Sequence, residues 1–134
     1  MRFLKIVGVI LLVVVGCGVG AQLYFLYAHP LPAIAAGLPR FVHDAEKEFD
    51  RRIKERFPIG SSEKDLVIEL NRQGFPAPIQ CYSVARKPGD ENCRYTTFSR
   101  ASAIFIEEAV RVVWRTDGEG KLSEIVGAYG LTGL

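Results

Sequence analysis

Two cysteines, Cys81 and Cys93, are the side chains whose type and spacing most clearly predict chemistry. They flank the turn-rich stretch of residues 87–92, whereas the third cysteine, Cys17, lies within an apolar run. Outside the cytoplasm two such thiols oxidise to a disulfide, and closing a loop of about a dozen residues would stabilise the fold by about 3 kcal/mol. They face each other only if the chain turns near Lys87. The alternative is that both are small buried apolar side chains.

Few other residues are of the types that catalysis or metal binding requires. His29 follows the apolar run and His43 stands among charged residues, where a solvated side chain is the simpler interpretation. Glu107 and Glu108 are adjacent, and neighbours on a strand point to opposite faces. Neither domain cysteine has a second ligand at zinc-site spacing, and no glycine-rich loop has phosphate-binding spacing. We therefore expect no catalytic residue, cofactor, nucleotide or metal, with a membrane-tethered hydrolase as a lesser alternative.

Charge divides the chain into two parts. Between Lys5 and Arg40 there is no Lys, Arg, Asp or Glu, whereas all 15 acidic residues lie from Asp44 onward. The part from Arg40 is formally neutral, so the net charge of +2 comes from Arg2 and Lys5. Because phosphate binding needs a basic face, this neutral part gives no support for nucleic acid as a partner.

The uncharged run predicts a membrane anchor. Residues 6–28 form an apolar stretch that as a helix would extend roughly 35 Å, more than the roughly 30 Å of a bilayer core. Arg2 and Lys5 favour a cytoplasmic amino terminus, and Tyr24 and Tyr27 suit the outer interface. We expect residues 1–28 to be an uncleaved single-pass anchor in the inner (cytoplasmic) membrane, with the carboxyl-terminal domain outside the cytoplasm.

The same run contains two processing signals. Residues 14–17 resemble the lipobox of bacterial lipoproteins, with lipidation at Cys17, and residues 19–21 would pass as an ordinary signal-peptidase site. Cleavage at either site would leave the aromatic segment of residues 23–27 exposed at the new amino terminus, where a soluble protein has little reason to keep it. We therefore favour the anchor, with a periplasmic lipoprotein processed at Cys17 as the alternative.

The pattern beyond the anchor predicts two helices. Residues 29–39 contain three prolines and a glycine, which indicates a short, stiff linker before a domain at residues 40–134. Apolar residues at three- and four-residue spacing then predict an amphipathic helix over residues 40–57, stopped by Pro58. Residues 60–65 start a second helix, with a serine as its N-cap and acidic residues in its first turn.

The remainder of the chain has the composition of strands. We expect them at residues 79–85, 94–98, 110–115 and 122–129, with a hairpin turn at residues 117–120. Residues 102–108 are ambiguous between an early start of the third strand and a short helical turn. The predicted fold class is α+β: an N-terminal transmembrane helix, then two helices packed on one face of a three- to four-stranded antiparallel sheet.

Two stretches of this domain resemble a known family. The glycine–serine helix start of residues 60–67 and the strand, Asp-Gly turn and Lys-Leu strand of residues 113–125 look like the SmpA/OmlA family of small outer-membrane assembly lipoproteins and the wider β-lactamase-inhibitor-protein-like fold. The likeness covers roughly residues 59–127. This chain departs from that family in its expected uncleaved anchor and its additional helix at residues 40–57. The resemblance implies a binding, scaffolding or inhibitor module rather than an enzyme, although a fold alone does not define function.

Aromatic residues of the first domain helix suggest a docking surface. Phe41, Phe49 and Phe57 recur every eight residues, which turns about 80° per step around a helix, so they cannot all face the sheet. We predict an interaction surface for another envelope protein or a second copy, because exposed apolar patches mark such sites. It comprises Phe41, Phe49, Tyr129 and Leu131. The alternative is an ordinary core helix with a frayed tail. The overall expectation is a membrane-anchored envelope interaction or scaffolding module.

Overall fold

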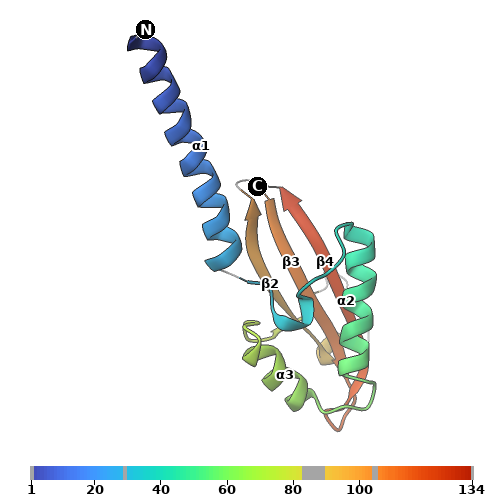
Figure 1. The fold of residues 1–134 in the computed structure, drawn as a ribbon. Coiled ribbons are helices and arrows are strands. Elements are labelled where there is room, and N and C mark those ends of the chain that lie inside the picture. The colour runs from blue at the N-terminus through green and yellow to red at the C-terminus, as the bar shows by residue number, and fades with distance from the viewer. Residues whose placement is uncertain (1, 29, 83–89, 104–105, 134) are drawn as a thin grey trace.

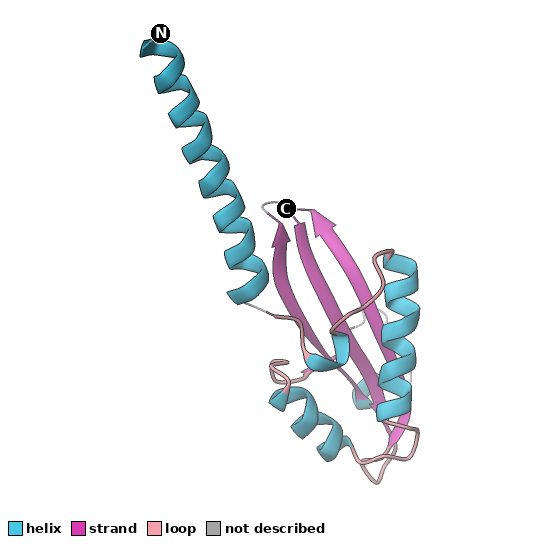
Figure 2. Cartoon of the chain, viewed as in Figure 1, coloured by secondary structure: helices cyan, strands magenta, loops and turns pink. Residues whose placement is uncertain are grey.

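The chain forms one antiparallel sheet with helices packed on it. The computed structural model describes residues 2–28, 30–82, 90–103 and 106–133. The elements are α1 (Arg2–Ala28), the 3₁₀ turn η1 (Ala33–Ala35), α2 (Val42–Arg56), α3 (Glu63–Arg72), β1 (Ile79–Gln80), the 3₁₀ turn η2 (Asp90–Asn92), β2 (Cys93–Ala103), β3 (Ile106–Thr116) and β4 (Leu122–Gly133). The four strands are ordered β1-β2-β3-β4, and α2 and α3 cover the sheet (Figures 1 and 2). The predicted α+β class is confirmed.

Alternation along the strands gives the sheet one covered and one solvated face. On β3 the side chains of Val110, Val112 and Trp114 are buried, while Arg111 between them is exposed. The core they form takes in side chains of η1, α2, α3 and β4. Its buried members are Ala35, Phe49, Ile53, Phe57, Leu66, Leu70, Phe75, Val110, Val112, Trp114, Leu122 and Ile125. In α+β domains an antiparallel sheet usually has helices packed on one face and is exposed to water on the other.

The strands are longer than their composition predicts, except for the first. β2 runs to Ala103 and β3 starts at Ile106, so the described part of the ambiguous stretch is strand, and residues 104 and 105 lie outside the described residues. Cross-strand pairing with the long β3 extends β2 and β4 beyond the sequence signal. β1 is shorter than expected, because only Ile79 and Gln80 pair with β2.

Helix α3 begins differently from the prediction. Ser62 occupies the N-cap position, but its side chain makes no capping hydrogen bond. Instead the backbone N–H of Glu63 donates to the carbonyl of Gly120, at 3.0 Å, within the turn that precedes β4. A tertiary backbone contact thus satisfies the first free N–H donor of the helix, while the serine side chain makes no capping bond.

The predicted linker is part of the folded unit. Ala35 in η1 is fully buried, and Leu31, Ile34 and Leu38 pack against the core. The backbone N–H of Ile34 donates to the side-chain oxygen of Gln73 at 2.9 Å. The prolines stiffen the segment, but its apolar side chains hold it on the domain, which therefore begins before residue 40.

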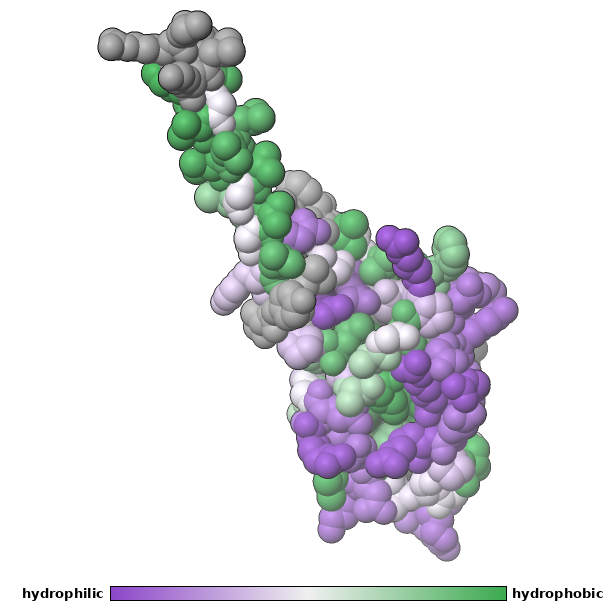
Figure 3. All heavy atoms as spheres, in the orientation of Figure 1, coloured by the Kyte–Doolittle hydropathy of each residue, from purple (hydrophilic) through white to green (hydrophobic). Residues whose placement is uncertain are grey.

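Helix α1 is apolar and is not covered by the domain. Residues Ile6–Tyr24 make up the one helix among the described residues that is long and apolar enough to cross a membrane, and none of it is buried. Figure 3 shows its hydrophobic surface projecting away from the more polar domain. The end of α1 nearest the domain lies beside β2 (Figure 1). A cleaved signal sequence meets the same criteria of length and composition.

Helix α2 lies so close to β4 that one position on the strand must be glycine. A Cβ atom at Gly127 would lie 2.9 Å from Cδ1 of Phe49 and 3.1 Å from Cα of Asp50. The N–H of Gly127 also donates to Oδ1 of Asp50, at 3.0 Å. Because the second clash involves backbone, a side chain here requires the helix to move away from the sheet.

Replacing Gly127 with alanine should therefore lower the free energy of unfolding by about 1–3 kcal/mol, the usual cost of overpacking. Urea unfolding of the full chain in detergent, followed by fluorescence of the single and buried Trp114, measures the loss. Gly130→Ala is the matched control, since it lies on the same strand with nothing within 4 Å of the added Cβ. Equal unfolding midpoints for the two variants would disprove the close contact.

Candidate functional site

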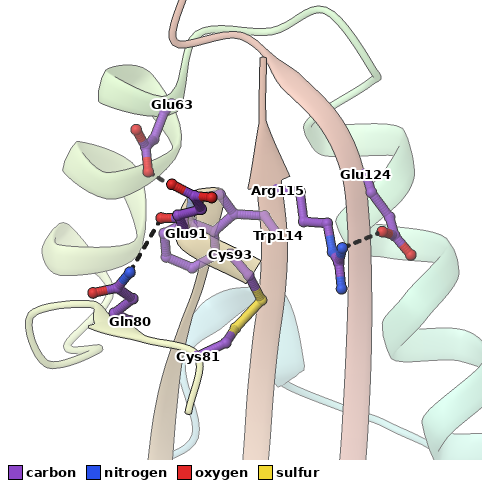
Figure 4. Close-up of a disulfide and its surroundings, with 8 residues drawn as sticks. All are labelled: Glu63, Gln80, Cys81, Glu91, Cys93, Trp114, Arg115 and Glu124. Carbon is purple, nitrogen blue, oxygen red and sulfur yellow. Dashed lines mark hydrogen bonds and ion pairs between the residues drawn. A yellow bond between two sulfur atoms is a disulfide. The ribbon is translucent and has the colours of Figure 1, made fainter. Parts of the chain in front are cut away.

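The predicted disulfide is present. Cys81 and Cys93 are joined, with their Cα atoms 5.3 Å apart, and the N–H of Cys81 donates to the carbonyl of Cys93 at 2.9 Å. The bond links the end of the short β1 to the first residue of β2 (Figure 4). The turn predicted near Lys87 lies outside the described residues. The disulfide holds β1 at the edge of the sheet, where only two residues of β1 pair with β2.

A carboxylate on α3 lies next to this disulfide and joins the helix to the sheet. Oε1 of Glu63 accepts hydrogen bonds from Nε1 of Trp114, at 2.9 Å, and from a guanidinium nitrogen of Arg94, at 3.1 Å. Figure 4 shows Glu63 directed at the indole from the helix, with Cys93 on the strand beside it. Tryptophan N–H usually finds a partner when it is buried, and Glu63 provides it here.

A second polar cluster lies on the covered face, toward the end of the sheet where β4 ends. Nε of Arg100 donates to Oε2 of Glu108 at 2.8 Å, and the hydroxyl of Tyr129 donates to Oε1 of the same carboxylate, also at 2.8 Å. The Arg100 and Glu108 side chains are only 13% and 11% exposed. Burial, followed by the hydrogen bond and charge of Glu108, raises the pKa of Tyr129 to about 12.

Local patterns in the sequence do not indicate this cluster. Arg100 and Glu108 are directly opposite each other on β2 and β3, and opposite charges at such positions attract. Detecting the pair from sequence requires the register between the strands, which could not be assigned while residues 102–108 were ambiguous. Glu107 points to the other face, as strand alternation predicted for adjacent carboxylates.

These clusters are suited to holding the fold together. Among the described residues, every buried side-chain nitrogen and oxygen atom has a hydrogen-bond partner. Nor do the described residues include a group of three or more His, Cys, Asp or Glu side chains placed to hold a metal ion. His43 is exposed on α2, and His29 lies outside the described residues. The described polar groups thus bind one another, which favours structural roles for them.

The predicted interaction residues have different environments. Phe41 is 75% exposed and Leu131 is 45% exposed. Tyr129 is half-buried and packs against the core. Phe49 is completely buried, so its place in the predicted surface was wrong: it shares the inward face of α2 with Ala45 and Ile53.

The error has a physical cause in the helix boundary. The eight-residue spacing was interpreted as rotation around one helix that included Phe41. Phe41 is instead the N-cap residue, with an extended backbone at φ −87° and ψ 131°. Helical spacing therefore does not describe the direction of its side chain. Of the three phenylalanines only Phe49 lies within α2, and Phe57, the C-cap residue, is also buried in the core.

Cys17 is a free, exposed thiol on α1. It lies within the apolar span Ile6–Tyr24, so it would face lipid if that span crosses a bilayer. Its modification by lipid stays a prediction.

Comparison with known proteins found no matching family model, no matching curated protein and no matching solved structure. The resemblance to the SmpA/OmlA family therefore stays a prediction.

Proposed function

We propose that this protein is a membrane-anchored interaction module of the bacterial cell envelope. The observation that carries the proposal is the apolar helix: 19 residues, Ile6–Tyr24, are left entirely unburied by a domain that has a core of its own. Such a surface is costly in water and favourable in lipid. With Arg2 and Lys5 at its start, the helix is oriented with its amino terminus in the cytoplasm.

The disulfide supports a domain outside the cytoplasm. Disulfides such as Cys81–Cys93 form and persist in oxidising compartments, whereas cytosolic thiols are kept reduced. A single anchor in the inner membrane, followed by a domain on its outer side, places the thiols where oxidation occurs. The SmpA/OmlA resemblance agrees with an envelope role.

A periplasmic lipoprotein or inhibitor of the same fold is the second candidate. It is favoured by Cys17, which is free and exposed and follows a lipobox-like sequence. In that form the chain would begin at Cys17 and carry lipid. The intact mass of protein purified from membranes separates the two candidates, because the anchor form retains residues 1–16.

The interaction role rests on apolar side chains that the domain leaves uncovered at the start of α2. Phe41 is 75% exposed and its neighbour Val42 is 41% exposed, and Phe41 is not part of the core cluster. We infer that another envelope protein binds here. Tyr129 is unsuited to testing the idea, because its hydroxyl is bound to Glu108 and a charged substitution would disturb the core.

Replacing Phe41 with glutamate should reduce recovery of a cross-linked partner at least fivefold, because it puts a charge into an apolar contact, while the melting temperature changes little. The measurement is quantitative co-purification from solubilised membranes after cross-linking in cells. Ile68→Glu is the control, since Ile68 on α3 is also exposed, at 54%.

Two results would contradict this assignment. Equal partner recovery for the Phe41 and Ile68 variants would show that the start of α2 is not the docking surface. A drop in melting temperature for Phe41→Glu alone would show that Phe41 contributes to folding. A cross-link only between differently tagged copies of the chain would replace the partner protein with a second copy.

A further inference from the structure

Three strand ends meet beside the end of α1 that is nearest the domain. β2 ends at Ala103, β3 begins at Ile106 and β4 ends at Gly133, and Ile106 pairs with both Ala103 and Gly133. Figure 1 shows that these three strand ends extend alongside the part of α1 nearest the domain. Strand β2 contacts α1. We call the described residues 130–133 of β4, together with Ser102 and Ile106, the sheet end.

The residues of the sheet end are themselves uncharged and partly apolar, although Glu107 lies directly opposite Thr132 in the ladder. Ile106 is 42% exposed and Leu131 is 45% exposed, and the other members are glycine, serine and threonine. These exposed isoleucine and leucine side chains lie at the end of the sheet whose strand β2 contacts the apolar helix. Contiguous surface of this kind marks a contact with lipid or with another protein.

The nearest charges of the covered face are neutralised. Arg100 and Glu108, in the row of the sheet that also holds Leu131, form an ion pair at 2.7 Å. An ion pair with satisfied hydrogen bonds is far less costly near lipid than a single charge. On the other face Glu107 is next to Ile106, which limits the depth to which this end can enter hydrocarbon.

We propose that the sheet end lies in the interfacial layer of the bilayer that α1 crosses, as a second membrane contact of the domain. This inference rests on the proposed function, because it requires α1 to be a membrane anchor. Lipid is the occupant that the position of the surface favours: the apolar helix beside it already enters the bilayer. Tyr24, at the end of the apolar span, is of a residue type that is enriched at this interface.

The contact would fix how the domain stands on the membrane. The turn at residues 117–120, which joins β3 to β4, is at the opposite end of these strands from the sheet end (Figure 1). With the sheet end at the interface, this turn points away from the bilayer. A domain held at two points, α1 and the sheet end, has a fixed orientation relative to the membrane.

Depth-dependent fluorescence quenching tests the contact. Single cysteines are introduced at Thr132, Glu119 and Leu12 in full-length Cys17→Ala protein with the disulfide intact, and each is labelled with an environment-sensitive fluorophore. The protein is reconstituted into vesicles of phosphatidylcholine and phosphatidylglycerol that contain lipids with a quencher near the headgroups or deep in the chains. Leu12 lies within the apolar span and Glu119 in the distant turn.

We expect the shallow quencher to reduce the emission of the label at position 132 at least twofold and to leave the label at position 119 unchanged. The deep quencher should act on the label at position 12. If the label at position 12 is quenched but the label at position 132 is as little affected as the label at position 119, the second contact is disproved and the anchor is retained. A label at position 12 that neither quencher reaches overturns the proposed anchor, and the second contact with it.

A charged variant gives an independent readout. Ile106→Glu combined with Leu131→Glu should move the label at position 132 into water and abolish its quenching, while Ile68→Glu should not. Because Leu131 is directly opposite Glu108, the new carboxylate should lower the melting temperature, and quenching is therefore measured well below the midpoint of each variant. Persistent quenching in the double variant would contradict lipid contact through these side chains.

Discussion

Replacing Glu108 with alanine should lower the free energy of unfolding by about 3 kcal/mol, the lower end of the range for breaking a buried ion pair. The lower end applies because Arg100 and Glu108 retain 13% and 11% exposure. The variant removes the carboxylate that pairs with the Arg100 guanidinium at 2.7 Å and the acceptor of the Tyr129 hydroxyl. Urea unfolding of the full chain in detergent, with Trp114 as the probe, gives the value.

Two further variants show whether burial is the cause. Glu124→Ala removes a carboxylate from an exposed pair with Arg115, and such pairs contribute at most about 1 kcal/mol. Combining Arg100→Met with Glu108→Leu should recover part of the lost stability, since both members of the buried ion pair are replaced by apolar side chains. If Glu108→Ala and Glu124→Ala lose similar amounts of stability, the cluster does not hold the strands together as described.

Removing the disulfide should cost about 3 kcal/mol, the chain-entropy estimate for a loop of this length. The variant replaces Cys81 and Cys93 with serine together, so that no single thiol remains to form wrong pairs. The loss of stability should come from the edge of the sheet where β1 pairs with β2, because β1 contributes only two residues to that ladder. Unfolding in urea with and without reductant measures it.

The reductant provides the internal control for this prediction. The unmodified protein should lose stability when reduced, whereas the double serine variant should be unaffected because it has no bond to break. A variant as stable as the oxidised protein would contradict a stabilising role for the bond. So would an unmodified protein whose thiols are fully labelled under denaturing, non-reducing conditions.

Short-range patterns in the sequence were sufficient to predict one helix, one hairpin turn and the disulfide. The predicted helix at residues 40–57 is α2, Val42–Arg56, because its apolar spacing and Pro58 are short-range features. The hairpin turn at residues 117–120 was found from its Asp-Gly signal, and the disulfide from two thiols around a turn-rich segment. None of these predictions required knowledge of the tertiary contacts.

Features that depend on tertiary contacts could not be predicted from short-range patterns. The length of β4 and the opposition of Arg100 and Glu108 depend on strand register. A serine side chain was expected to cap α3, but Ser62 makes no capping bond, and the carbonyl of Gly120, 57 positions along the chain from Glu63, accepts the N–H of Glu63. The burial of Phe49 depends on where α2 begins and on the absence of a side chain at Gly127.

Labelling of an exposed turn in intact cells tests the central claim most directly. Glu119→Cys in full-length Cys17→Ala protein places one free thiol in the turn at residues 117–120, which is exposed at position 119. A thiol reagent that cannot cross the inner membrane should label it in cells with a permeabilised outer membrane, and the labelled species should have the mass of the full chain. Labelling only after the inner membrane is lysed, or a labelled species that lacks the residues of α1, would contradict an anchored domain outside the cytoplasm.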